Sequence, residues 1–417
     1  MMKSVGCRLN WLQTALLCVT VLLLLLISWR YHFSSGPRSS TIQRDNGNSN
    51  SNRFSLDRGS QSDNVQYARK DSILERRMPD RTMGAKSLEN IPVVDSPVRA
   101  IISKCDPSKE TMNSNTEPQV FMYNESSWIY DKNICSDVEG LIQDKLHFGK
   151  VTFHSLVGDM PIYIHDPASD GISKAVLRTH NFEPHVFKTL YPLLKLDPEV
   201  SLIDIGANIG VNSLQAAKYG RNAIALEATT ESTQHICASA TAGNVLNKLT
   251  IIHNAISNDH TPVKIIHATG GGFGGAFMDD NSDLHKLKVA WDGNVFNFNK
   301  ATILRTATLD DILDLPHACA FRKSLIKMDV EGSEHKAFQG AVKFFEKVDV
   351  QGVLMEYRWH VTRPTKHVIL DFFKKFNFDP YDFKSGTLRK LEAQTMKNHD
   401  VLWLPQYRSY LDGVKIW

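Results

Sequence analysis

Short apolar runs that alternate with longer periodic segments constrain the fold of this chain more than any other feature. Each run has the length of a buried strand, and the segments between them place apolar residues at helical spacing. Strand and helix patterns in alternation predict an α/β fold, with a mostly parallel, doubly wound sheet covered by helices on both faces. The runs are Leu202 to Ile205, Ala223 to Leu226, Leu249 to Ile252, Leu325 to Met328, Val353 to Met355 and Val401 to Leu404.

The first of these runs continues into a glycine turn, in the sequence SLIDIGANIGVNSLQAA that begins at Ser201. Gly206, directly after the apolar run, lets the backbone turn and come close to a ligand, and the next helix would point its free N–H groups at the same place. A nucleotide-type ligand is the natural occupant. The alternative is a tight packing turn between strand and helix, which also favours glycine.

A second strand ends in a carboxylate about 20 residues further on, at Glu227, where a ribose hydroxyl pair would be held. NAD and S-adenosylmethionine both carry such a ribose. A dinucleotide turn has the spacing G-x-G-x-x-G, whereas this chain has G-x-x-x-G preceded by Asp204. An acid in this strand suits a cationic sulfonium ligand better than a pyrophosphate.

Charged residues cluster after the strand Leu325 to Met328, in the sequence IKMDVEGSEH. Lys327, Asp329, Glu331 and Glu334 would lie at the carboxyl edge of the sheet, and Glu356 ends the next strand at the same edge. Acids that complement a helix dipole could account for Glu331 and Glu334, but not for Lys327 or Asp329. The cluster therefore favours a functional site.

With these motifs the chain resembles the FkbM-type methyltransferases, a branch of the S-adenosylmethionine-dependent Rossmann-like enzymes. The resemblance covers roughly 155 to 404 and rests on the ordered motifs IDIGANIGVNSLQAA, ALEA, ATLDDIL, IKMDVEGSEHKAFQGA and VLMEYRW. It implies a Rossmann-like methyltransferase fold. It also implies that Asp204, Gly206, Asn208 and Gly210 line the methionine side of S-adenosyl-L-methionine and that Glu227 holds the ribose. One departure is Ala228, where the family commonly has proline.

The resemblance further implies methyl transfer to a hydroxyl group. An acid cluster can take the proton of an alcohol as the methyl group moves, so Asp329 and Glu331 are the expected acid–base residues, with Lys327 and Glu334 beside them. His335 is an alternative base, although at a helix start it is more often a cap-region residue. Four acids could also hold a divalent cation, but the pattern does not require one, and no metal is predicted.

The N-terminal part predicts a membrane anchor and a stem. The run from Trp11 to Trp29 is almost wholly apolar and long enough to cross a bilayer. A cleaved signal peptide is the alternative, but its apolar region is shorter and ends in a small-x-small site. The expected organisation is a cytosolic tail (1–10), a signal anchor (11–29), a disordered luminal stem (30–100), an N-terminal extension (101–154) and a methyltransferase domain (155–417).

A luminal location predicts further features. Cys105 and Cys135 would form a disulfide, Cys237 and Cys319 would be buried thiols, and Asn124 begins an N-glycosylation sequon. The net charge of +3 argues against nucleic acid as a partner. The glycine-rich stretch from Thr269 to Gly275 is either a lid over the acceptor or an inert loop.

These features together predict a single-pass type II membrane protein facing the Golgi lumen. Its function would be S-adenosylmethionine-dependent O-methylation of a glycan or another secretory-pathway hydroxyl compound. The alternatives are a luminal binding protein that keeps the fold without turnover and an NAD-dependent oxidoreductase, which the glycine spacing disfavours.

Overall fold

The computed structural model describes most of the chain after residue 116. The described residues are 117–124, 126–136, 138–143, 149–267, 276–279, 301–394 and 396–417. The predicted anchor, the stem and the glycine-rich stretch at 269–275 lie outside them. Within the described part, no helix is both long and apolar enough to cross a membrane.

Ten strands from the described part of the chain form the main sheet, in the order β16-β15-β17-β14-β13-β5-β6-β7-β1-β2. The middle of the sheet, from β14 to β1, is parallel, and the flanking pairs are antiparallel. All six predicted strands are confirmed as members of this sheet. The strands are β1 (Gln119–Asn124), β2 (Ser127–Tyr130), β5 (Ser201–Ile205), β6 (Ala223–Leu226), β7 (Leu249–Ile252), β13 (Lys323–Met328), β14 (Asp349–Glu356), β15 (Phe378–Asp382), β16 (Arg389–Lys390) and β17 (Asp400–Pro405).

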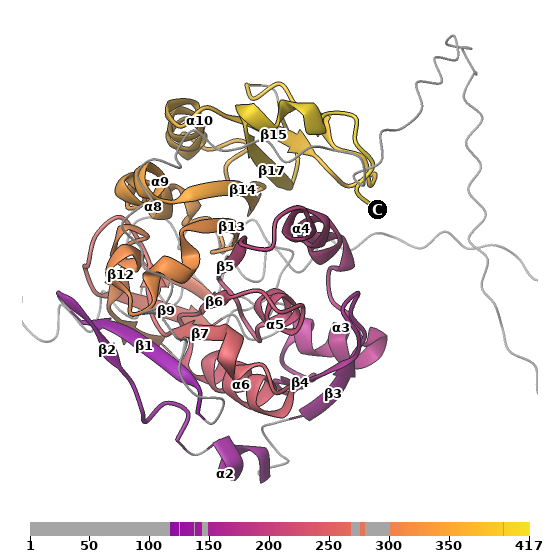
Figure 1. Ribbon diagram of the computed structural model, residues 1–417. Helices are drawn as coiled ribbons and strands as arrows, with labels where there is room; N and C mark the ends of the chain where they lie inside the picture. The colour runs from indigo at the N-terminus through magenta and orange to yellow at the C-terminus, as the bar shows by residue number, and fades with distance from the viewer. Residues whose placement is uncertain are drawn as a thin grey trace, which may run out of the picture. The chain divides into compact units, whose positions relative to one another are not determined.

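Helices cover both faces of this sheet (Figure 1). Successive strand residues point to opposite faces, so Leu202 of β5 packs with one helical layer while Ile203 and Ile205 pack with the other. The first layer holds α4 (Pro184–Leu196), α5 (Val211–Lys218) and α6 (Thr230–Ala242), and the second holds α8 (Glu334–Gln339), α9 (Val342–Lys347) and α10 (Thr365–Lys375). The doubly wound α/β prediction is confirmed.

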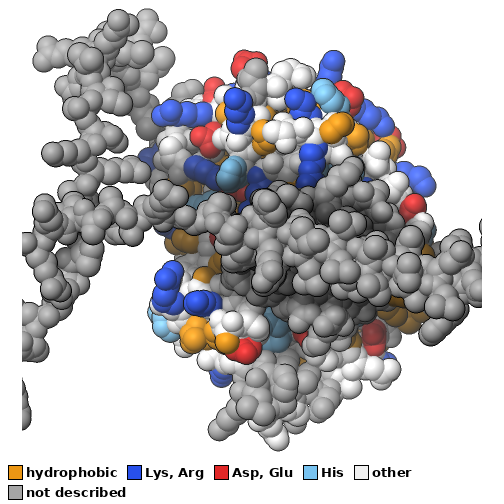
Figure 2. Space-filling view, turned by 180° about the vertical axis from the view of Figure 1, so that it is seen from behind, with side chains coloured by type: hydrophobic (Ala, Val, Ile, Leu, Met, Phe, Trp, Pro, Cys, Tyr) orange, Lys and Arg blue, Asp and Glu red, His pale blue; other side chains and the backbone are white. Residues whose placement is uncertain are grey.

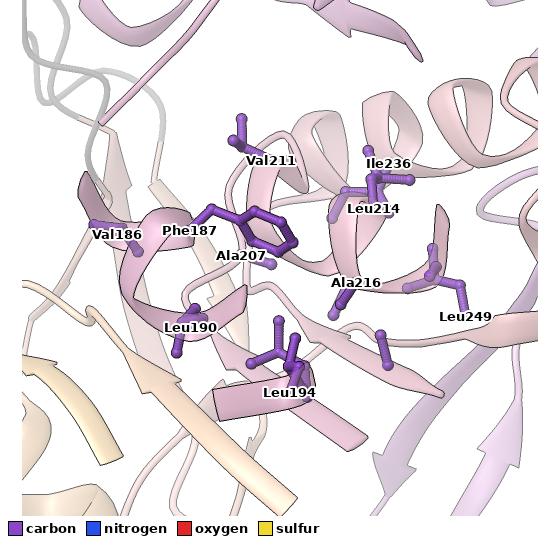
Figure 3. Close-up of a cluster of buried hydrophobic side chains, with 14 of the residues drawn as sticks. Val186, Phe187, Leu190, Leu194, Ala207, Val211, Leu214, Ala216, Ile236 and Leu249 are labelled. Carbon is purple, nitrogen blue, oxygen red and sulfur yellow. The ribbon is translucent and has the colours of Figure 1, made fainter. Parts of the chain in front are cut away.

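The first helical layer encloses the larger hydrophobic core (Figure 3). Val186, Phe187, Leu190 and Leu194 project from α4 toward α5 and the sheet, as their spacing in the sequence predicts. Pro192 lies inside the last turns of this helix without ending it. The burial of each large apolar side chain contributes about 2 kcal/mol, and these contributions stabilise the packing of α4 on the sheet. Its first residues are thereby fixed beside the ends of β5 and β13.

Smaller elements complete the described chain. The predicted N-terminal extension and the predicted methyltransferase domain are connected by hydrogen bonds between strands. β1 of the extension pairs with β7 of the domain, and the predicted boundary at residue 154 falls between the paired strands β3 and β4. The further elements are α2 (Val138–Gln143), β3 (Gly149–Phe153), β4 (Met160–Ile164), α3 (Gly171–Thr179), β8 (Ala255–Ile256), β9 (Val263–His267), β10 (Ala276–Asp279), β11 (Ala301–Leu304), β12 (Thr306–Ala307), and the 3-10 turns Leu246–Lys248, Asp310–Asp314, Ala318–Phe321 and Gln406–Leu411.

The cysteine pairing differs from the prediction. Cys135 forms a disulfide with Cys237, not with Cys105, and Cys319 is also disulfide-bonded rather than a free thiol. The reason is tertiary: Cys135 lies just before α2, which packs on α6, and Cys237 lies in α6. A separation of 102 residues gives no sign of this contact in the sequence.

The surface carries both signs of charge. Figure 2 shows the face turned away from the viewer in Figure 1, where Lys and Arg side chains are interspersed with Asp and Glu on the coloured part. This distribution agrees with the small net charge of +3.

Candidate active site

A pocket opens at the carboxyl ends of β5, β6 and β13, the edge at which the sequence places its two motifs. Six predicted residues line it: Gly206, Asn208, Glu227, Lys327, Asp329 and Glu331. Asp204 and Gly210, which are also expected to contact the cofactor, are not among the residues that line it. The two motifs, more than 100 residues apart, therefore form one site.

The glycine turn fits tightly against the end of β13. Gly206 has φ +75°, and a Cβ atom there would lie 1.8 Å from the backbone oxygen of Asp329. Gly210 has φ +83° and begins α5, and a Cβ there would press against Ile236 and Leu214. Asn208 between them is also left-handed, with φ 51°. Only glycine allows such a close approach to the backbone of Asp329. Gly206 is therefore needed for packing between the turn and the end of β13, and this need is compatible with a ligand at the same turn.

Glu227 is fixed by the same turn. Its Oε2 accepts a hydrogen bond from the backbone N–H of Asn208 at 2.8 Å, and its Oε1 accepts two from Thr229. The carboxylate is therefore held in one orientation at the pocket wall, where one lone pair of Oε2 remains for a ligand. This geometry fits a ribose hydroxyl.

Part of the pocket wall is apolar. Ile256, Ile265 and Met278 line it, from β8, β9 and β10. Such a wall suits the flat face of a purine. A carboxylate for the ribose and an apolar wall beyond it together fit an adenosine group. The sequence gives no direct signal for this wall, because the small sheet of β9, β10 and β11 forms only through tertiary pairing.

Asp204 and Lys327 form a buried charge cluster beneath the turn. The ammonium of Lys327 lies 3.5 Å from Oδ1 of Asp204 and 3.7 Å from Oδ2 of Asp329, and it donates to the carbonyl oxygen of Gly206 at 2.9 Å. Asp204 also accepts a hydrogen bond from the backbone N–H of Ser213 in the first turn of α5. Burial alone would lower the pKa of Lys327, but the nearby carboxylates of Asp204, Asp329 and Glu183 raise it. Lys327 therefore stays charged and fixes the turn.

Three carboxylates meet beside this cluster. Single oxygens of Asp329, Glu331 and Glu356 all lie within 4.8 Å of one another. Burial and the charge of Asp329 raise the pKa of Glu331 to about 8, and burial with Asp329 and Glu331 raises that of Glu356 to about 10. The side chains are 34%, 15% and 10% exposed, in the order Asp329, Glu331, Glu356. Asp329 is thus the member of the trio that is most open to the pocket.

A guanidinium already supplies positive charge to this trio. Arg358 forms ion pairs with both Glu331 and Glu356, and Trp359 donates its indole N–H to Glu356 at 2.6 Å. The spacing of the three carboxylates would admit a divalent cation, but their contacts with Arg358 neutralise part of the charge that would attract one. The sequence indicated Glu356 but not Arg358.

Glu334 is not among the described residues that line the pocket. It is fully buried, accepts hydrogen bonds from the backbone N–H groups of Val330 and Gly332, and pairs with His360 at 2.7 Å. The ring of His335 packs against that of His360, and His335 is likewise not among the lining residues. Both residues hold the turn that carries Asp329 and Glu331. Their spacing in the sequence could not separate this supporting position from a place in the pocket.

Comparison with known proteins gives one family and several similar solved structures. Residues 204–380 match the model of a methyltransferase FkbM domain. No curated protein matches the chain. Similar solved structures include an S-adenosylmethionine-dependent O-methyltransferase from Thermotoga maritima (10% identity, covering 71% of this chain and 95% of that one, TM-score 0.27) and a precorrin-6y C5,15-methyltransferase from Geobacter metallireducens (10% identity, 53% and 85%, TM-score 0.25).

Proposed function

We propose that this chain, an S-adenosylmethionine-dependent methyltransferase, transfers a methyl group to a hydroxyl of a glycan or another secretory-pathway compound. The matched domain supports the enzyme class. The observation that carries the proposal is the position of Asp329, which lines the same pocket as the glycine turn and Glu227. A carboxylate in that place can receive the proton that an alcohol releases.

The residues of the pocket would have different roles in the transfer. When bound, S-adenosylmethionine supplies an electrophilic methyl group on a sulfonium. Glu227 would hold the ribose, and the apolar wall at Ile256 and Met278 would cover the adenine. Asp329 would accept the proton of the acceptor hydroxyl as its oxygen forms a bond to the methyl carbon and the bond from that carbon to sulfur breaks. Alignment of the acceptor contributes most to such a transfer.

Glu331 has a different part in this scheme. Its Oε2 accepts a hydrogen bond from Arg358 at 3.4 Å, and its side chain is less exposed than that of Asp329, so Glu331 would hold the end of this segment in place while Asp329 accepts the proton. Lys327 would act through the turn, since its ammonium binds the carbonyl oxygen of Gly206 and the carboxylates of Asp204 and Asp329. Lys327 is therefore a positioning residue.

Cofactor binding and turnover test the proposal separately. Asp329→Asn should bind S-adenosylmethionine in calorimetry and lose methyl transfer to glycan hydroxyls by a factor of about 10² to 10⁴. Glu346→Gln, at an exposed acid in α9, is the matched control and should retain both. Unchanged turnover in Asp329→Asn would exclude this residue as the base. Cofactor binding by the wild type without turnover on any acceptor would support the alternative of a luminal binding protein.

Two features of the described chain support a secretory location. The disulfide between Cys135 and Cys237 persists only where thiols stay oxidised. Asn124 is exposed at the turn between β1 and β2, and Ser126, the third residue of its sequon, is exposed as well. Glycosidase treatment of the protein from a eukaryotic host should increase its gel mobility, and Asn124→Gln should abolish that shift. No shift in the wild type would count against a luminal location.

A further inference from the structure

Glu183 has a backbone conformation that its side chain disfavours. It lies directly before α4 with φ 40° and ψ 56°, in the left-handed region. For a residue with a Cβ atom this region costs about 1–2 kcal/mol, and the following Pro184 restricts the backbone of Glu183 further. Strained residues persist where the surrounding structure fixes them, and they cluster at ligand sites.

Helix capping does not explain the strain at Glu183. An acid before a helix commonly accepts a hydrogen bond from a backbone N–H of the first turn, but no side-chain cap bond forms at the start of α4. Within the described residues, no hydrogen bond or ion pair holds the carboxylate of Glu183. Its side chain instead lines the pocket, in the same wall as Gly206, Lys327 and Asp329.

Glu183 is exposed overall, and the two described cations that act on its carboxylate already have carboxylate partners. Desolvation at the pocket wall and the charges of Asp329 and Asp400 raise its pKa, whereas Lys327 and His185 oppose this effect, and His185 itself lies 3.8 Å from Asp400. The ammonium of Lys327 is already engaged by Gly206, Asp204 and Asp329. A cation that entered this end of the pocket would therefore relieve the repulsion between Glu183 and Asp329.

We infer that Glu183 is a cofactor-binding residue that holds the α-ammonium group of the methionine end of S-adenosylmethionine. The inference rests on the proposed function, which supplies the cofactor. Its position supports the assignment: Glu183 lines the same pocket as Glu227, and its carboxylate is close enough to Lys327 and Asp329 to feel their charges. The chemical group recognised is a primary ammonium, which a carboxylate binds through a charge-assisted hydrogen bond.

Two ligands that differ in the amino-acid part test this inference. Calorimetry with Glu183→Gln should show S-adenosylmethionine binding weakened roughly tenfold or more, the usual effect of losing a charged hydrogen bond. Binding of 5′-methylthioadenosine, which lacks the ammonium and the carboxylate, should not change. Glu346→Gln should leave both affinities unchanged. Equal loss for both ligands, or no loss for either, would overturn the assignment.

A second variant separates ligand binding from folding. Glu183→Gly removes the strain at φ 40°, so its thermal midpoint should stay the same or rise, while its affinity for S-adenosylmethionine falls as in Glu183→Gln. A fall in both would show a structural role and overturn the inference. If the wild type binds neither ligand, the proposed function fails; if the wild type binds S-adenosylmethionine and Glu183→Gln binds it equally well, only the inference fails.

Discussion

The ammonium of Lys327 lies 3.5 Å from Oδ1 of Asp204, and this buried ion pair connects β13 to β5 beneath the glycine turn. Both side chains are buried, and Asp204 is fully so. The pair joins the strand that carries the expected cofactor turn to the strand that carries the expected acid–base residues.

Removing one partner of this pair should destabilise the fold strongly. Lys327→Met leaves Asp204 buried without its cation, which costs about 3–5 kcal/mol. Chemical denaturation should show this loss, while the double variant Lys327→Met with Asp204→Asn should regain part of it, because no buried charge is left alone. Equal destabilisation in the single and double variants would mean that the two charges are not coupled.

Glu227 should be required for cofactor binding. Glu227→Ala removes the proposed ribose ligand and also the acceptor of hydrogen bonds from Asn208 and Thr229, so the glycine turn loosens as well. Calorimetry should show no S-adenosylmethionine binding at concentrations that saturate the wild type. Glu227→Gln, which keeps an acceptor oxygen, should bind weakly. Wild-type affinity in Glu227→Ala would remove this residue from the site.

Stability should fall as the pH rises from about 4.5 toward 10. An unfolded glutamate titrates near 4.5, whereas the folded pKa values of Glu331 and Glu356 are raised to about 8 and about 10. The folded state thus binds more protons, and the stability that these protons contribute is complete below pH 4.5 and is lost as the pH rises through 8 to 10. The loss should reach at most about 1.4 kcal/mol per pH unit for each group. Denaturation at pH 6 and pH 9 measures it, and Glu331→Gln should flatten the dependence. A stability that increased over this range would contradict the assignment.

The disulfide between Cys135 and Cys237 should contribute substantially to stability. It closes a loop across a separation of 102 residues, for which chain entropy gives about 4–5 kcal/mol, whereas disulfides in general contribute about 2–4 kcal/mol. Cys135→Ser should lower the thermal midpoint, Cys237→Ser should lower it equally, and the double variant should lower it no further. Additive losses would mean that the two cysteines act independently.

The sequence predicts the sheet and its functional edge well, for a physical reason. Buried parallel strands are continuous apolar runs, as at Leu202 to Ile205, so their order and ends are visible in the chain. Asp204, Glu227 and Asp329 lie at or beside those ends, and their positions follow directly.

Side chains whose place depends on distant packing could not be predicted. Glu183 faces Lys327 because α4 packs across the sheet, and Cys237 meets Cys135 because α6 packs against α2. Glu334 has the spacing of its acidic neighbours but is directed to His360 by the turn at Glu331, where φ is 53°. Each case depends on a contact between residues that the local pattern does not relate.

The pairing of β1 with β7 sets how much of the chain must be kept together. A fragment that began at Ser155 would remove β1 and β2 and leave β7 with a row of unbonded backbone groups at the edge of the sheet, which invites association between copies. The matched span of 204–380 also omits β17, which pairs with both β14 and β15. The segment that carries the motifs is therefore shorter than the segment that can fold. The ends of a recombinant fragment should be chosen so that every strand keeps its hydrogen-bonded neighbours, and not from the positions of the motifs.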